Sequence, residues 1–160
     1  MLLSITPVYS IEIQKIVSPE GLVAWLVEDH ANPIITVNFA FRGGAALDPA
    51  QKNGLANFVA STMDEGAGEL DSQEFQKELD DLSISLGFSA NKEFFSGFLR
   101  TLSWNRDRAF ELLKIAINKP RFDLQAVERV RSQILAIIRR SSEDPDHIAS
   151  QQMFKALFPN

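Results

Sequence analysis

The feature that most restricts the fold is an alternation of apolar and polar residues through positions 83–103, interrupted once. Apolar residues occupy every second position from Ile84 to Ala90, and a phenylalanine-rich stretch, FFSGFLRTLS, follows Asn91-Lys92. A period of two places every second side chain on the same face of a strand. We therefore expect a β-hairpin here, with its turn at Asn91-Lys92.

Three more strands are expected in the first third of the chain. Residues 11–17 and 22–27 are rich in apolar and β-branched residues, and residues 37–42 again alternate with a period of two. Turn-forming residues separate these stretches at 18–21 (SPEG) and at 29–33 (DHANP).

Helical patterns fill most of the remaining chain. Asp48-Pro49 resembles a cap and first-turn proline for a helical approach to Gly54, and the helix that follows ends in the glycines of DEGAG. Asp71 with Glu74 predicts a capping box for a second helix. A third helix is expected after Asn105, with the buried stripe Ala109, Leu112, Leu113 and Ala116.

Two further helices are expected near the end of the chain. One begins at Asp123 and runs to about Ser142, and the last is capped by Asp144-Pro145. In the last helix we expect three apolar side chains to pack inward, namely Ile148, Met153 and Leu157. The order of elements predicts an α+β fold, a largely antiparallel sheet with helices layered on it.

The 160 residues, 45% apolar and 23% charged, have the composition of one soluble domain. We assign residues 11–160 to this domain and expect it to be incomplete at the C-terminus, because the chain stops where a helix should lead to a further element. No stretch after the N-terminus is apolar for long enough to span a membrane.

The net charge of −5 argues against nucleic-acid binding, which needs a basic surface. The arginines of RVRSQILAIIRR are spread along a helix and are expected on a solvated face; they are Arg129, Arg131, Arg139 and Arg140. The absence of cysteine removes disulfides and thiolate chemistry without fixing the compartment.

Residues 1–10, MLLSITPVYS, are apolar and end in small residues at the spacing of a signal-peptide cleavage site. They predict a signal-peptide remnant and a periplasmic or exported protein. The alternative is a strand-like extension of a cytoplasmic protein.

The stretch GLANFVASTMDEGAG, residues 54–68, carries both a helix pattern and the spacing of a metal site. One face is expected to be buried and comprises Leu55, Phe58, Val59, Thr62 and Met63. Asn57, Ala60 and Ser61 fall on another face at i, i+3 and i+4, the spacing of a metal site on one helix. None of the three is a good zinc ligand.

Four segments together resemble the N-terminal part of the insulinase/pitrilysin-type zinc peptidase family, which includes the mitochondrial processing peptidases. They are GLVAWLVEDHANP, FRGGAALDPAQKNGLANFVASTMDEGAG, the ANKE turn, and FELLKIAINKPRFD. Active members of that family carry the inverted zinc motif H-x-x-E-H after G-L-A, with two histidine ligands and a glutamate base.

The resemblance implies that the zinc site is missing. The ligand positions hold Asn57 and Ser61, the base position holds Ala60, and the distal glutamate ligand corresponds to Ile137 or its neighbour Ala136. We therefore predict no catalytic residues, no bound metal and no cofactor.

Other catalytic interpretations are weaker. Ser61 lacks a G-x-S-x-G elbow, and the pairs Asp64-Glu65 and Asp80-Asp81 are typical of solvated helix ends. Arg42-Gly43-Gly44 lacks the downstream lysine of a phosphate loop. Surface positions are expected for the two histidines, His30 and His147.

The resemblance leaves three functions open. The chain is a noncatalytic subunit that pairs with an active zinc peptidase and helps to enclose or hold peptide substrates, a stand-alone binding or scaffold protein, or an enzyme with an unrelated site. As a fragment it is also expected to self-associate through apolar side chains around Phe94, Phe95 and Phe98 and around Met153, Phe154 and Leu157.

Overall fold

The computed structural model describes residues 12–159, which form two compact units that divide between Pro33 and Ile34. The first unit contains an antiparallel hairpin of β1 (Ile13–Val17) and β2 (Val23–Val27). A turn closed by the Gly21 N–H donating to the Ser18 carbonyl joins the two strands. Residues 1–10, the predicted signal-peptide remnant, lie outside the described residues.

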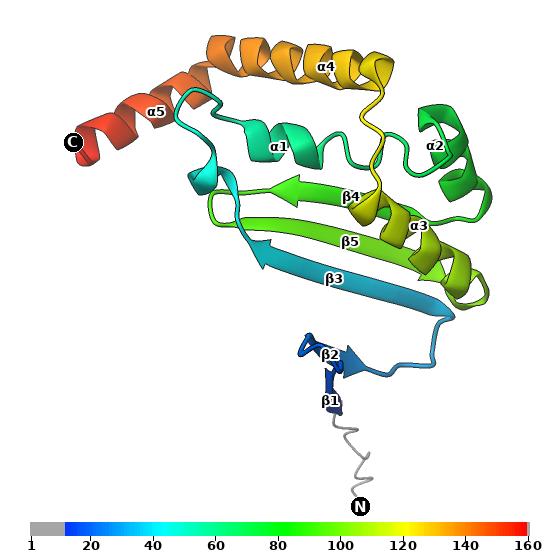
Figure 1. The fold of residues 1–160 in the computed structure, drawn as a ribbon. Coiled ribbons are helices and arrows are strands. Elements are labelled where there is room, and N and C mark those ends of the chain that lie inside the picture. Colours follow the sequence, from blue (N-terminus) through cyan, green and yellow to red (C-terminus); the bar gives the residue numbers. More distant parts are fainter. Residues whose placement is uncertain (1–11, 160) are drawn as a thin grey trace, which may run out of the picture. The chain divides into compact units, whose positions relative to one another are not determined.

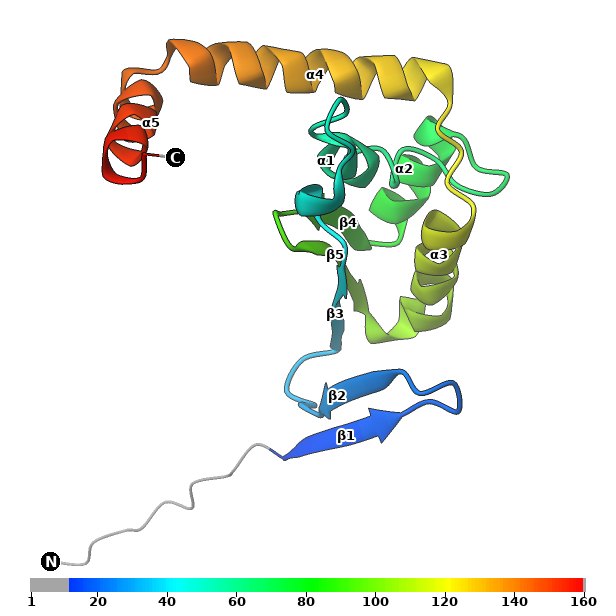
Figure 2. The same ribbon diagram turned by 60° about the vertical axis from the view of Figure 1, so that its left-hand side comes forward.

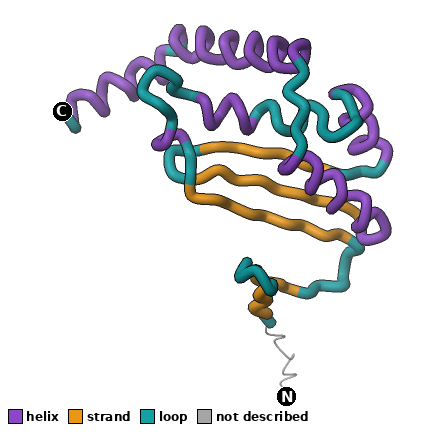
Figure 3. The backbone as a smooth tube through the Cα atoms, viewed as in Figure 1, coloured by secondary structure: helices purple, strands orange, loops and turns teal. Residues whose placement is uncertain are grey.

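The second unit is built on an antiparallel sheet in the order β3-β5-β4 (Figures 1 and 3). Its strands are β3 (Ile34–Arg42), β4 (Ser85–Ala90) and β5 (Phe94–Leu102). Val37 and Leu86 both lie opposite Leu99, so apolar residues of all three strands share one face. The hairpin predicted from the alternation is confirmed as β4 and β5.

Among the residues of this unit that the structure describes, five α-helices and two short 3-10 helices accompany the sheet. They are η1 (Ala45–Leu47), α1 (Leu55–Ala60), α2 (Ser72–Asp81), η2 (Ser103–Asn105), α3 (Arg106–Asn118), α4 (Leu124–Glu143) and α5 (Pro145–Leu157). Figure 2 shows α1, α2 and α3 on the same side of the sheet, with α4 crossing over α1. The α+β class predicted from the sequence is confirmed.

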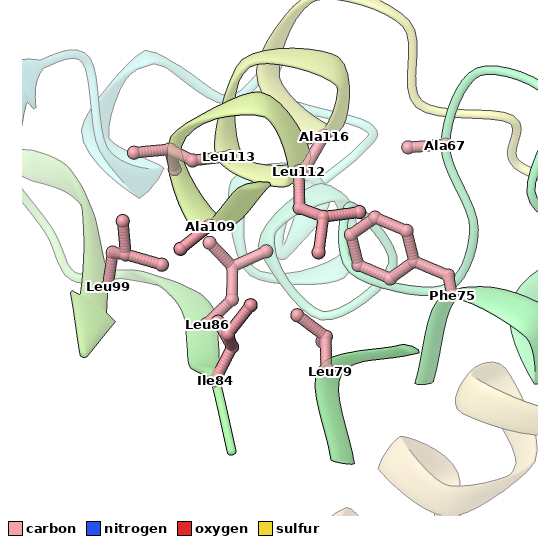
Figure 4. Packing of buried hydrophobic residues seen from close by; sticks show 10 residues of the cluster. All are labelled: Ala67, Phe75, Leu79, Ile84, Leu86, Leu99, Ala109, Leu112, Leu113 and Ala116. Carbon is pink, nitrogen blue, oxygen red and sulfur yellow. The ribbon is translucent and has the colours of Figure 1, made fainter. Parts of the chain in front are cut away.

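The hydrophobic core lies between the sheet and these helices (Figure 4). Phe75 of α2, Leu99 of β5 and Leu112 of α3 are completely buried at its centre. Burial of a side chain of this size contributes about 1.5–3 kcal/mol relative to exposure. The predicted stripe of α3 is confirmed, because all four of its members are buried: Ala109, Leu112, Leu113 and Ala116.

The side-chain caps predicted at Asp71 and Asp144 are confirmed, whereas the one predicted at Asn105 is not. The capping box at α2 is confirmed, with the Asp71 carboxylate accepting from the Glu74 N–H at 2.9 Å and the Glu74 carboxylate accepting from the Asp71 N–H at 3.0 Å. Asp144 caps α5 as predicted. Asn105 precedes α3 without a side-chain cap, because its amide donates instead to the Leu82 carbonyl at 2.7 Å.

The last helix differs from its prediction. Ile148, Met153 and Leu157 are 42%, 53% and 62% exposed, so the expectation that they pack inward is wrong. Figure 1 shows the reason: α5 continues past the sheet and the layer of α1 to α3, which leaves it without a neighbouring core. Within residues 12–159, no helix combines the length and the apolar character needed to cross a lipid bilayer.

Candidate functional site

The start of α1 is fixed by a carboxylate that lies outside the helix. Asp48 accepts a hydrogen bond from the Gly54 N–H at 2.7 Å and another from the Ala56 N–H at 3.0 Å. These two N–H groups have no partner within the helix, so the carboxylate provides the cap. The predicted helical approach from Asp48-Pro49 to Gly54 is wrong, because residues 48–54 form turns.

The three motif positions lie on or directly after α1. Asn57 is exposed, and the Ser61 hydroxyl donates to the Asn57 carbonyl at 2.9 Å, so it is turned back onto its own helix. Ala60 is only 2% exposed, whereas Leu55 of the predicted buried face is 40% exposed. The division into a buried face and a polar face is therefore wrong for Ala60 and Leu55.

The distal position lies on α4. Ile137 is 63% exposed, and its neighbour Ala136 is also exposed. In the part of the chain from residue 12 to residue 159, no three histidine, cysteine or acidic residues gather closely enough to hold a metal ion. The assignment of Asn57, Ala60, Ser61 and Ile137 to the lost motif stays a prediction.

A polar cluster joins α4 to the segment between α1 and α2. Glu65 pairs with Arg129 of α4 and accepts a hydrogen bond from the Ser72 hydroxyl at 2.7 Å. The Glu65 side chain is only 14% exposed. The interpretation of Asp64-Glu65 as a solvated helix end is therefore wrong. Arg129 is exposed as predicted, although it pairs with Glu65, and Asp80 and Asp81 are also exposed as predicted.

Asp64 lies beside this cluster in an unfavourable place for a charge. The pKa of its carboxyl is raised to about 6, chiefly by burial and to a smaller extent by the negative charge of Glu65; the backbone N–H of Asp64 and the charge of Arg129 act in the opposite direction. The pKa in the folded protein thus lies above the ordinary value of 3.8. Its contribution to stability is present below that value and is lost as the pH rises through about 6.

We expect Asp64→Asn to stabilise the protein at pH 7 by about 1–3 kcal/mol, because a neutral amide avoids the cost of a half-buried charge. The gain should disappear below about pH 4, where the wild-type carboxyl is protonated. Urea unfolding across this pH range measures the difference. Asp80→Asn, at an exposed position of α2, serves as the control and should change little; an equal gain in both variants at pH 7 would contradict the assignment.

The remaining sequence candidates lie on surfaces or in turns. The side chain of His30 is 89% exposed, and His147 is exposed at the start of α5, as predicted. The N–H groups of Gly43 and Gly44 both donate to the Glu93 carbonyl, at 3.0 and 3.1 Å. These donors hold the β4–β5 turn, which agrees with a structural role for the two glycines.

Three residues position this region, and sequence reasoning found the role of only one of them in part. Asp48 was recognised as a cap, although for a helical stretch before Gly54 that does not form. Glu65 and Arg129 are 64 residues apart and carry no shared motif, so only the folded chain reveals their pairing. Together the three residues fix both ends of the segment that contains α1.

Comparison with known proteins agrees with this architecture. Residues 23–160 match the family described as Insulinase (Peptidase family M16). The chain is 32% identical over 133 residues to a protein of Helicobacter pylori (strain ATCC 700392 / 26695) named "Non-peptidase homolog YmxG", a match that covers 83% of this chain and 31% of the relative.

Solved structures share the fold. The peptidase M16 inactive domain from Pseudomonas fluorescens superposes with a TM-score of 0.81 at 24% identity, covering 91% of this chain and 35% of that one. Pitrilysin superposes with a TM-score of 0.69 at 21% identity, covering 81% of this chain and 14% of that one. At these identities the structures establish the fold alone.

The chain spans about a third of the length of its Helicobacter relative and of the Pseudomonas structure. The family match nevertheless extends over most of the chain and includes α1, where the motif positions lie. The chain therefore belongs to the insulinase family, peptidase family M16.

Proposed function

We propose that the chain is part of a noncatalytic family member that pairs with an active zinc peptidase and helps to enclose or hold peptide substrates. The observation that carries the proposal is the state of α1. The helix and its Asp48 cap are intact, while the motif positions hold an exposed amide, a buried methyl group and a hydroxyl bonded to the helix itself. Zinc hydrolysis needs about three strong ligands and an activated water.

The names of two similar proteins support the loss of catalysis. The Helicobacter relative is called a non-peptidase homolog, and the Pseudomonas structure is called an inactive domain. Both are about three times the length of this chain, so the activity of the whole protein is part of the proposal. The apolar residues 1–10 support an exported or periplasmic location within the same proposal.

The edge of the sheet supports a role in holding extended peptides. Within residues 34–159, β4 is paired on one side only, with β5. Its outer N–H and C=O groups are the kind of template to which an extended peptide adds as a further strand. This edge is the one closest to α1 (Figure 1).

Exposed apolar side chains support association with another protein or with a second copy. Phe98 on the open face of the sheet is 43% exposed, and Phe154 and Leu157 of α5 are 57% and 62% exposed. Large apolar side chains that gather at a surface commonly mark interaction sites. Phe94 and Phe95, expected in the same patch as Phe98, are half-buried.

Co-purification with a family member that carries an intact H-x-x-E-H motif, followed by peptide cleavage by each protein alone and by both together, tests the proposal. We expect no cleavage by this protein alone and at least about tenfold faster cleavage by the pair than by the partner alone. A partner whose zinc-binding histidines are replaced is the control. Cleavage by this protein alone that persists with a chelator would contradict the proposal and favour an unrelated active site. A stable complex with proteins other than a peptidase would favour the scaffold function.

A further inference from the structure

A small groove lies between the start of α1 and the middle of α4, apart from the lost motif positions. Its volume is about 350 Å³, and its main lining residues are Lys52, Leu55, Phe58, Arg131, Ile134 and Ile138. Asn57, Ala60, Ser61 and Ile137 do not line it. No local sequence pattern predicts this groove, because its two sides are more than 70 residues apart along the chain.

The floor of the groove is apolar and accessible. Leu55 and Phe58 form an i, i+3 pair on α1, and Ile134 and Ile138 form an i, i+4 pair on α4, so each helix contributes two neighbouring side chains. Leu55 is 40% exposed and Ile138 is 56% exposed, while Phe58 and Ile134 are half-buried. A bulky apolar side chain inserted here would remove both exposed residues from water.

Both charged residues that line the groove, Lys52 and Arg131, are basic. Among the described residues, no carboxylate oxygen lies within 4.0 Å of the Lys52 ammonium group. Arg131 pairs with Glu128 of its own helix at 3.5 Å, with both side chains more than half exposed. Such an exposed ion pair contributes little to stability, so Arg131 can exchange Glu128 for the carboxylate of a ligand at little cost. The carboxylate of Asp48 nearby is already bonded to two N–H groups of α1.

We infer that this groove binds the C-terminal residue of a peptide, with a bulky apolar side chain between α1 and α4 and the terminal carboxylate at Lys52 and Arg131. A C-terminal apolar residue carries both an apolar side chain, which matches the apolar lining, and a carboxylate, which matches the two basic side chains. Charge complementarity therefore selects this occupant over a wholly apolar segment. The inference rests on the proposed role in holding peptides and specifies which end of the peptide is held.

Fluorescence anisotropy of the full-length protein with N-terminally labelled peptides tests the inference. One peptide ends in leucine with a free carboxylate, a second carries a C-terminal amide, and a third ends in serine. We expect the first to bind about tenfold more tightly than either of the others, because each loses one of the two interactions. Its affinity should fall between about 0.05 M and about 0.5 M salt, as expected for an exposed charge contact.

Matched variants locate the site. Lys52→Glu and Arg131→Glu should each weaken binding of the free-carboxylate peptide about tenfold, whereas Arg140→Glu on the same helix should not. Ile138→Ser should weaken it, whereas Ile137→Ser, a neighbouring exposed position outside the groove, should not. Circular dichroism checks that each variant is folded.

Three outcomes would overturn the inference: equal affinity for the amidated peptide, equal effects of the Ile137 and Ile138 variants, or no binding because another segment or a second copy covers the groove. None of them affects the test of the proposed function, since co-purification and cleavage with the partner are measured separately. Retained enhancement of cleavage by the Arg131→Glu variant would leave the proposed function standing without the groove.

Discussion

Replacing Ala60 by glutamate, the residue at the base position of active family members, is expected to destabilise the protein by at least about 3 kcal/mol. Ala60 is 2% exposed, so the longer side chain must displace packed neighbours, and its carboxylate must enter a place that is shielded from water. Overpacking alone costs about 1–3 kcal/mol, and burying an unpaired charge adds to it. Urea unfolding at pH 7 measures the loss.

Two control variants separate volume from charge and position. Ala60→Gln keeps the added volume without the charge and should recover part of the loss. Asn57→Glu, at an exposed position in the first half of the same helix, should be nearly neutral. A fully tolerated Ala60→Glu would show that the base position is still open. The restored motif Asn57→His, Ala60→Glu and Ser61→His is accordingly expected to fail first at Ala60.

Gly44→Ala is expected to destabilise the protein by about 2–4 kcal/mol. A Cβ atom at Gly44 would lie 2.2 Å from the Asn91 carbonyl oxygen and 2.7 Å from the Phe94 nitrogen, both of them backbone atoms that cannot rotate away. The displaced backbone would also strain four hydrogen bonds that hold the loop before α1 on the β4–β5 turn. Thermal or urea unfolding measures the effect.

Gly54→Ala is the matched control for this prediction. Gly54 has a φ of +92° and open space around it, so alanine there meets backbone strain without a collision. Strain of that kind costs about 1–2 kcal/mol. Gly44 has a φ of −80°, so its loss would come from the collision alone. If Gly44→Ala lowered the stability less than Gly54→Ala, the backbone of the β4–β5 turn would have to move aside at little cost in free energy, which would contradict the prediction.

The Ala60→Glu and Gly44→Ala variants act on the same feature of the molecule, the packing of the α1 segment onto the sheet. Gly44 fixes the loop that enters the segment, and Ala60 lies where α1 meets the core. Two apolar side chains of α1, Leu55 and Phe58, line the groove toward α4. Under the proposed function, peptide contacts are therefore expected around α1.

The sequence by itself determined the local elements. Alternation identified β3 and the hairpin of β4 and β5, because a strand with one buried face must repeat every two residues. The capping box at Asp71 and Glu74 and the apolar stripe of α3 also depend only on residues a few positions apart. The family resemblance was also found from the sequence, because it depends on the residues within four segments and not on how those segments are placed in space.

Only the tertiary structure decided which distant residues contact one another and which side chains are buried. The pairing of Glu65 with Arg129, the cap that Asp48 gives to α1, and the close approach of Gly44 to Asn91 all join residues that share no local pattern. Burial was decided in the same way: Ala60 is covered and Leu157 is exposed, although Leu157 is the more apolar of the two. The periodicity of a helix shows which side chains share a face, but whether that face is buried depends on which other elements pack against it.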